Sequence, residues 1–248
     1  MEETLKIILL AITGLAAGFI NVNAGGGSTI TLPALIFLGL DSTLANGTNR
    51  VGILFQNIFA VKSFRNQAVH HTRESLKLSA ATLPGAILGS FLSIQISDVW
   101  FERLLAIIMV GIVITMIIPR GKISHERTSP HPQHRFAGMV GLFFIGFYGG
   151  FIQVGVGFLL MAVLYHVLKL NLVYVNMHKM FIVAIYTIPS IIIFSLSGNI
   201  HWLYGLILGI GNAIGAWWGA KIQVKGGETI IKAILAVAIL MMAIKLII

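Results

Sequence analysis

The chain has 248 residues, of which 57% are hydrophobic and 10% are charged. A soluble domain carries about 25% charged residues, whereas the mean hydropathy here is +0.93. These values exclude an ordinary soluble protein and predict an all-α polytopic, multi-pass protein of the cell (cytoplasmic) membrane. The net charge of +9 comes from 17 lysines and arginines, which lie mainly between apolar runs and therefore indicate topology rather than nucleic-acid binding. The absence of cysteine excludes disulfides, cysteine-ligated zinc and iron–sulfur clusters.

The first apolar segment, residues 5–39, is too long for a single span, because about 20 residues cross the hydrocarbon layer. Residues 21–28 interrupt it with three glycines and two asparagines, a composition that disfavours a lipid-facing helix. The segment is therefore predicted to form two short helices around a break. Single spans are predicted to follow at residues 44–61, 78–96 and 104–118. Together these elements make up a first repeat, residues 1–119.

Residues 120–135 are the most polar stretch and are predicted to be a basic cytoplasmic linker. They hold four basic residues and the histidines His125, His131 and His134. Few carboxylates lie near these histidines, so we expect no metal site. The linker separates the first repeat from residues 136–248, which are predicted to form a second one.

The glycine pattern of the first repeat recurs in the second. The sequence at 18–22 (Gly-Phe-Ile-Asn-Val) returns at 150–154 as Gly-Phe-Ile-Gln-Val, and the Gly-x-x-x-Gly pattern at 85–89 returns at 211–215. Several matches in the same order indicate a duplication. Each repeat is thus predicted to be a broken-helix hairpin followed by three transmembrane helices.

Charge decides the relative orientation of the two repeats. If each hairpin enters and leaves on one side, each repeat makes an odd number of crossings and the two are inverted. This arrangement places 12 of the 17 lysines and arginines on the cytoplasmic side, as the positive-inside rule requires. Parallel repeats would instead move Lys221, Lys225 and Lys232 outside. We therefore predict inverted repeats with both chain ends outside.

Polar residues within the spans predict a ligand site. Arg50 and Lys179 are cations within apolar segments, where a charge costs a few kcal/mol. Arg50 follows Asn46 and Asn49, and Lys179 follows Asn176, on the same helix face, and each cation belongs to a repeat with a glycine-rich break. Broken helices direct main-chain N–H groups and a positive dipole end at an anion. The predicted substrate-binding residues, where the two breaks meet near the midplane, are Asn21, Asn23, Gly25, Gly26, Gly27, Thr48, Asn49, Arg50, Gln153, Gly155, Gly157, Asn176, His178 and Lys179.

Structural alternatives remain open for each group. Arg50 and Lys179 lie about six residues inside their spans and can also be explained by snorkelling to headgroups. Asn21, Asn23 and Gln153 can satisfy a structural kink. The glycines at 85–89 and 211–219 are expected to allow close helix packing, and His178 is either a proton carrier or a satisfied interior histidine.

The ordered motifs resemble those of the TauE/SafE family of sulfite-exporter-like membrane proteins. They are Gly18, the glycines at 25–27, the sequences at 32–35 (Leu-Pro-Ala-Leu) and 38–40 (Leu-Gly-Leu), Ala45, Thr48, the glycines at 85–89 and 211–219, and the turn at 198–202. The resemblance covers nearly the whole chain and implies transport of sulfur-containing anions such as sulfite, sulfonates or sulfoacetate. The sequence departs from the family pattern at 155–158 and 176–179, where members often carry a second glycine cluster and an Ala-x-x-Thr-Ser-like run.

The sequence as a whole predicts a secondary transporter of small, sulfur-containing anions that works by alternating access between the repeats. Walker, zinc-protease and nucleophile-elbow motifs are absent, so no enzyme activity, cofactor or metal is expected. An anion channel is the first alternative, and a membrane enzyme or structural subunit the second. The expected partners are a small anion and the lipid bilayer, with a homodimer as an open option and no nucleic acid.

Overall fold

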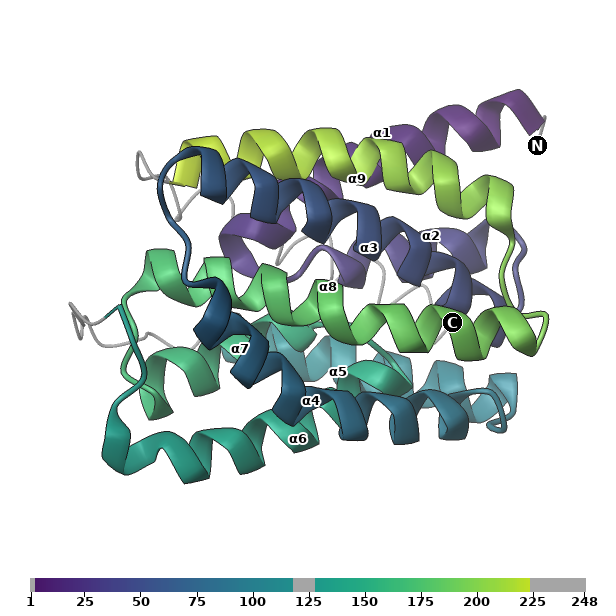
Figure 1. Ribbon diagram of the computed structural model, residues 1–248. Helices are drawn as coiled ribbons and strands as arrows, with labels where there is room; N and C mark the ends of the chain where they lie inside the picture. Colours follow the sequence, from purple (N-terminus) through teal and green to yellow (C-terminus); the bar gives the residue numbers. More distant parts are fainter. Residues whose placement is uncertain (1–2, 118–127, 224–248) are drawn as a thin grey trace.

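The computed structural model describes residues 3–117 and 128–223 of the chain. In these ranges the protein is a helical bundle without strands (Figure 1). Its α-helices are α1 (Glu3–Ala24), α2 (Ser28–Phe37), α3 (Ser42–Asn66), α4 (Thr72–Ser93), α5 (Asp98–Ile117), α6 (Arg135–Phe151), α7 (Val156–Ala162), α8 (Leu172–Leu196) and α9 (Trp202–Gln223). A π-helical turn, Val163–Val167, prolongs α7, and a 3₁₀ turn, Pro132–His134, precedes α6. The all-α prediction is confirmed.

Within residues 3–117 and 128–223, four helices are long and apolar enough to cross a bilayer: α1, α4, α8 and α9. Helix α3 has 25 residues, enough to span about 30 Å of hydrocarbon, but it carries many polar side chains. Those side chains are buried inside the bundle, so the polar sequence of α3 fits a spanning helix that is covered by protein. The predicted span at 44–61 corresponds to this helix.

The predicted break in the first apolar segment is present but shorter than expected. Helix α1 continues through Asn21 and Asn23 to Ala24, and only the three glycines 25–27 separate it from α2. The amide of Asn23 donates to the Phe19 carbonyl oxygen one turn earlier, and the Asn21 side-chain oxygen accepts the N–H of Gly27. These local bonds let both asparagines remain helical. Residues 120–127, half of the predicted linker, and residues 224–248 of the predicted second repeat lie outside the described residues.

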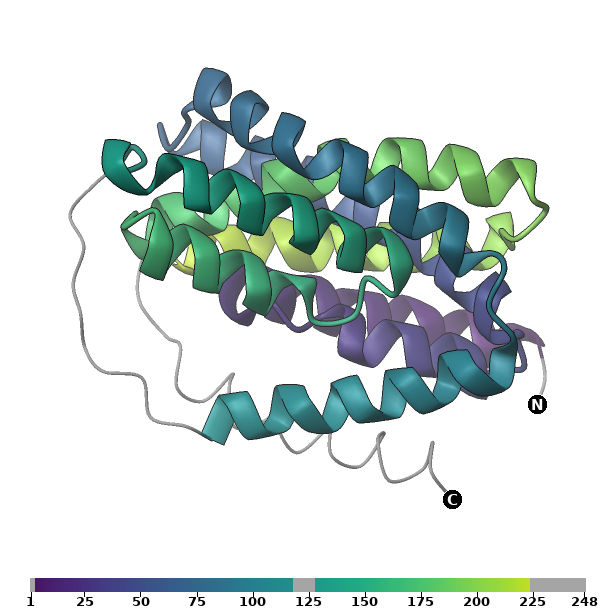
Figure 2. The same cartoon turned by 90° about the horizontal axis from the view of Figure 1, so that it is seen from below.

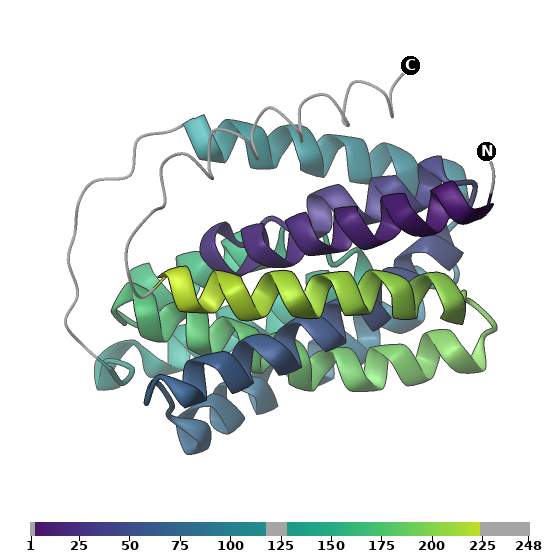
Figure 3. The ribbon, with the colours of Figure 1, turned by 90° about the horizontal axis from the view of Figure 1, so that it is seen from above.

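Six of the described helices form two groups of three that run in opposite directions. Helices α1, α3 and α9 are parallel: Gly18 packs on Asn212 of α9, and Ser63 near the end of α3 donates to the Trp217 carbonyl of α9. Helices α4, α6 and α8 are also parallel, since Gly146 packs on Thr82 and Ser90 donates to Ser190. Figures 2 and 3 show α4 beside α6 and α1 beside α9.

Glycine allows the tight contact in both groups. A side-chain carbon on Gly18 or Gly215 of the α1–α9 pair would overlap a main-chain atom of the facing helix. The same holds for Gly85 and Gly146 of the α4–α6 pair. Without a hydrophobic driving force between helices in lipid, such close approach supplies the van der Waals contact that holds them together. The predicted packing role of the glycines at 85–89 and 211–219 is what the structure shows.

The first prediction compares two glycines of α6. In Gly146→Ala the added carbon meets the Thr82 carbonyl oxygen, whereas in Gly141→Ala the nearest atom is a Val163 methyl carbon 3.3 Å away. We expect Gly146→Ala to destabilise the protein by roughly 1–3 kcal/mol, as overpacking does, and Gly141→Ala to leave stability nearly unchanged. Thermal unfolding in detergent measures both; equal melting temperatures would contradict the packing role.

Candidate functional site

The two helix breaks contact each other inside the bundle. Gly25, in the break of the first hairpin, lies against the main chain of Gly157 at the start of α7, so closely that a side-chain carbon on either would overlap the other. Between them the Ser28 hydroxyl donates to the Gln153 carbonyl at 3.2 Å and accepts the N–H of Gly155 at 3.3 Å. Residues 25–28 and 152–157 are all buried. Segments 132 residues apart thus form one continuous polar junction.

The backbone at this junction needs left-handed conformations. Gly25 has φ +87° and Gly155 has φ +69°, a region that glycine reaches at little cost. Gln153 has φ +69° as well, although it carries a side chain, so its conformation is unfavourable on its own. Its side-chain oxygen is held by Arg50 at 3.2 Å, which fixes the residue in place.

Arg50, on α3, caps the C-terminal end of α6. Its Nη1 donates to the Gly149 carbonyl oxygen at 3.1 Å, and its Nη2 donates to those of Gly150 at 2.5 Å and Phe151 at 3.5 Å. The guanidinium also lies 4.6 Å from the centre of the Phe194 ring, within cation–π range. Because the last carbonyls of a helix carry a partial negative charge, α6 supplies the acceptors for a fully buried cation.

Lys179, on α8, caps the C-terminal end of α1. Its ammonium donates to the carbonyl oxygens of Asn21 at 3.0 Å and Val22 at 3.3 Å, and to the Asn176 side-chain oxygen at 2.7 Å. Each half of the chain therefore provides the cation that caps the broken helix of the other half. The two contacts together hold the ends of α1 and α6 at the junction.

Burial decides against snorkelling for both cations. Arg50 and Lys179 have no exposed surface, and their donors point to carbonyls inside the bundle rather than to headgroups. Among the described residues no aspartate or glutamate is fully buried. Two positive charges are thus placed in the interior with helix ends as their counter-charge.

The remaining predicted site residues divide into two sets. Asn49, next to Arg50, is fully buried with neither side-chain polar atom hydrogen-bonded, and the Asn176 amide nitrogen is likewise buried without a partner. Three others bond elsewhere. The Thr48 hydroxyl accepts the N–H of His201 before α9, and the His178 ring contacts the Ser75 hydroxyl of α4 at 2.8 Å. The Asn23 amide donates to the Phe19 carbonyl oxygen within α1 at 2.8 Å and to the Gly219 carbonyl oxygen of α9 at 3.5 Å. These three belong to helix packing in this structure, and Gly26 and Gly27 form the first break itself.

Two polar residues inside the bundle were missed from the sequence, Ser28 at the junction and Asn212 between α1, α3 and α9. Ser28 bridges the two breaks, but in sequence it is only a small residue after glycines. Asn212 of α9 is fully buried with both side-chain atoms unbonded, against Gly18 and Gly52 of α1 and α3. A lone amide amid small residues and buried in the membrane was the available signal for Asn212.

Comparison with known proteins matches this picture. A model of the family described as "Sulfite exporter TauE/SafE" matches residues 10–246. The chain belongs to the TauE/SafE family. It is similar to a "Probable membrane transporter protein" of Haemophilus influenzae, with 27% identity over 97% of this chain and 94% of that protein. It is also similar to "Probable membrane transporter protein YfcA" of Escherichia coli strain K12, with 25% identity over 99% of this chain and 91% of that protein. No solved structure matches the chain.

The family and the apolar helices identify a multi-pass protein of the cell membrane. The matched residues include both helix breaks, both buried cations and Ser28. The descriptions of these relatives name no substrate. The chemistry of the site is therefore argued from its residues.

The second prediction tests the helix-capping role of Arg50. Arg50→Met keeps most of the side-chain length but leaves three carbonyls of α6 and the Gln153 side chain without their donor. We expect a loss of about 1.5–3 kcal/mol in stability, the contribution of hydrogen bonds to a charged group. Arg65→Met, on the exposed end of the same helix, is the control and should melt as the unchanged protein does. Equal melting temperatures of all three proteins would contradict the capping role.

Proposed function

We propose that this protein is a secondary transporter of small, sulfur-containing oxyanions and that it works by alternating access between two inverted repeats. The observation that carries the proposal is the pair of buried cations at the ends of α1 and α6, where the two helix breaks touch. The relatives named above are described as probable membrane transporters, which supports the general class.

The charge balance of the site favours an anion as substrate. Main-chain carbonyls are only partial counter-charges for Arg50 and Lys179, and hydrogen bonds from a charged donor to a charged acceptor are roughly twice as strong as neutral ones. A sulfite or sulfonate group would therefore compete with the carbonyls for the same donors. Arg50 has a further donor, Nε, that is buried without a partner. The amide nitrogens of Asn49, next to Arg50, and of Asn176, three residues before Lys179, are further unbonded donors.

The sulfur-containing class is supported by the family description, "Sulfite exporter TauE/SafE", and by the shape of the donors. A guanidinium presents planar N–H pairs that suit two oxygens of one oxyanion. Ser28, Asn49 and the glycine backbone add neutral donors of the kind that oxyanions also accept. This combination fits a compact oxygen-rich anion.

Helix directions support inverted repeats. The equivalent helices of the two halves are α1 and α6, α3 and α8, and α9 and α4, and in each pair the two run in opposite directions. The glycine pairs that pack α1 on α9 have counterparts, 132 and 126 residues away in sequence, that pack α6 on α4. Such repeats can rock against each other around a fixed site, and the cross-repeat caps of Arg50 and Lys179 lie on that interface.

The third prediction concerns substrate binding by purified protein in detergent, measured by calorimetry with sulfite and sulfoacetate. Arg50→Lys keeps the charge but loses the planar fork, so binding should weaken; Arg50→Gln should weaken it further, by roughly 1.5–3 kcal/mol. Lys179→Gln should act similarly through loss of a point charge. Arg65→Gln is the control, and melting curves establish that each variant is folded. Unchanged affinity in every folded variant would assign both cations to structure alone.

The fourth prediction concerns flux through proteoliposomes. Gly157→Ala places a carbon against the Gly25 carbonyl and separates the two breaks, so uptake of sulfite or sulfoacetate should fall at least tenfold, while Gly141→Ala should transport normally. Uptake should saturate with anion concentration and should not extend to small cations. Anion currents that do not saturate would identify a channel, and normal uptake by folded Gly157→Ala would show that contact between the breaks is not needed.

A further inference from the structure

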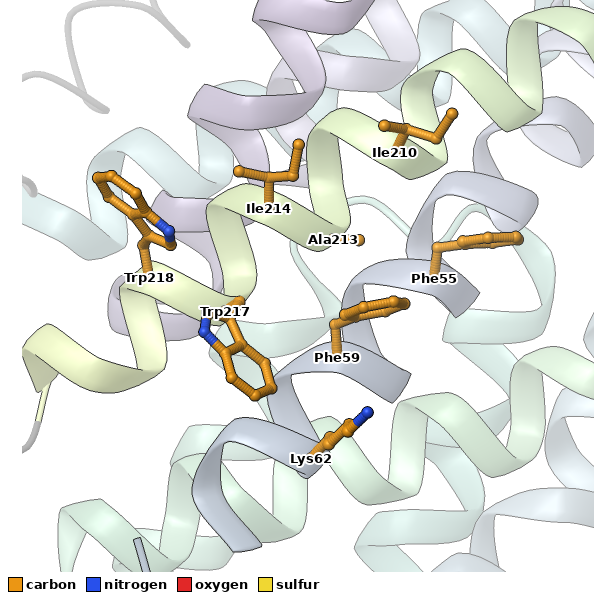
Figure 4. A pocket seen from close by; sticks show the side chains of 8 residues that line it. All are labelled: Phe55, Phe59, Lys62, Ile210, Ala213, Ile214, Trp217 and Trp218. Carbon is orange, nitrogen blue, oxygen red and sulfur yellow. The ribbon is translucent and has the colours of Figure 1, made fainter. Parts of the chain in front are cut away.

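An apolar groove runs along the outside of the bundle between α3 and α9 (Figure 4). Its volume is about 370 Å³, and we call it the α3–α9 groove. The lining residues are Phe55, Phe59, Lys62, Ile210, Ala213, Ile214, Trp217 and Trp218. On each helix these residues recur every three or four positions, so each helix contributes one continuous face.

The groove opens toward the lipid. Phe59 is 39% exposed, Ile214 47% and Trp218 63%, which distinguishes this surface from the buried polar junction. An apolar surface on a spanning helix is satisfied by acyl chains and needs no protein partner. The volume is at the lower end of the range of about 300–1,000 Å³ found for small-molecule sites.

One end of the groove is positively charged. Lys62 is the charged residue in its lining, and the ammonium of Lys221 lies 5.4 Å from the centre of the Trp217 ring. Both lysines lie near the C-terminal ends of their helices. Because α3 and α9 are parallel, these two ends lie at the same end of the bundle. The ion pairs found in the described part of the chain involve Lys6, Lys77 and Arg135 rather than these two lysines.

The same end of the bundle carries the loop between α3 and α4, with Arg65 and Arg73 beside it. Such an accumulation of basic residues is typical of the cytoplasmic membrane surface. Tryptophans near the end of a span, like Trp217 and Trp218, are typical of the level of lipid headgroups. The lysines are thus placed at headgroup depth, with the apolar groove extending from them into the hydrocarbon layer.

We propose that the α3–α9 groove is a binding site for one anionic glycerophospholipid. An acyl chain lies along Phe59 and Ile214, and the phosphate lies between Lys62 and Lys221 at the basic end. Complementary charge selects the headgroup, since basic pockets between spanning helices on the cytoplasmic side bind anionic lipids. A second copy of the chain fits less well, because its approach would bury two lysines against apolar side chains.

Tryptophan quenching tests the proposal directly. Trp100→Phe and Trp202→Phe together leave Trp217 and Trp218, both at the groove, as the remaining tryptophans of the chain. The protein is reconstituted in phosphatidylcholine vesicles and titrated with phosphatidylglycerol whose acyl chains are brominated. Half-maximal quenching should occur at a mole fraction at least fivefold lower than with brominated phosphatidylcholine of the same chains.

Matched variants separate the lysines from general membrane charge. Lys62→Gln and Lys221→Gln should each raise the half-quenching mole fraction about fivefold, the effect of one basic residue near an anionic surface. Arg73→Gln, at the same end of the bundle but on α4, should leave it unchanged. Added glycerol 3-phosphate or inorganic phosphate should not compete, because a free phosphate lacks the acyl chain.

Three results would overturn the proposal. The first is equal quenching by the two brominated lipids. The second is an equal rise of the half-quenching mole fraction in Arg73→Gln and in the lysine variants. The third is protection of both tryptophans from either lipid in a protein that native mass spectrometry shows to be dimeric. The last result would instead make the groove an interface between copies. None of these measurements includes a transported anion, so they stand apart from the test of the transport function.

Discussion

A helix that ends inside a bilayer leaves main-chain carbonyls that water cannot reach, and the architecture of this protein depends on how those carbonyls are satisfied. Both α1 and α6 end within the bundle. An unsatisfied main-chain group in hydrocarbon costs several kcal/mol, and several arise at each helix end. Arg50 and Lys179 supply charged donors to these ends. The same contacts give two buried cations the negative dipole ends that they need.

Each cation comes from the opposite half of the chain, and this explains the close packing elsewhere. Arg50 reaches α6 only if α3 lies against the second half, and Lys179 reaches α1 only if α8 lies against the first. Glycines in the α1–α9 and α4–α6 pairs allow the backbones to approach to that distance. A bulkier residue in either pair would displace a cap from its carbonyls. Packing and charge compensation are therefore one constraint rather than two.

Local composition was enough to predict part of this arrangement. Three consecutive glycines predict a break, and repeated small residues predict close packing, because both follow from the properties of glycine itself. The helix around Asn21 and Asn23 was predicted too short, since their bonds to Phe19 and Gly27 depend on local geometry. The polarity of α3 indicated buried donors but not their acceptors.

Partners across the two halves could not be predicted from one sequence. Nothing near Arg50 in the sequence points to Gly149 and Gly150, about 100 residues away, and nothing near Thr48 points to His201. Ser28 acquires its position only when the two breaks meet. Sequence reasoning thus found which residues are unusual in a membrane, whereas the fold determines which of them act together.

The caps also set a condition on any conformational cycle. A ligand shifts an equilibrium between two states only by its difference in affinity for them. In the state seen here, the Nη donors of Arg50 and the ammonium of Lys179 are bonded to helix ends, so an anion that takes these donors must release the ends of α1 and α6. The affinity of the anion for the two cations is then offset by the cost of the freed carbonyls. That offset favours moderate binding, which a transporter needs in order to release its substrate, and it couples occupancy of the site to the contact between the two halves.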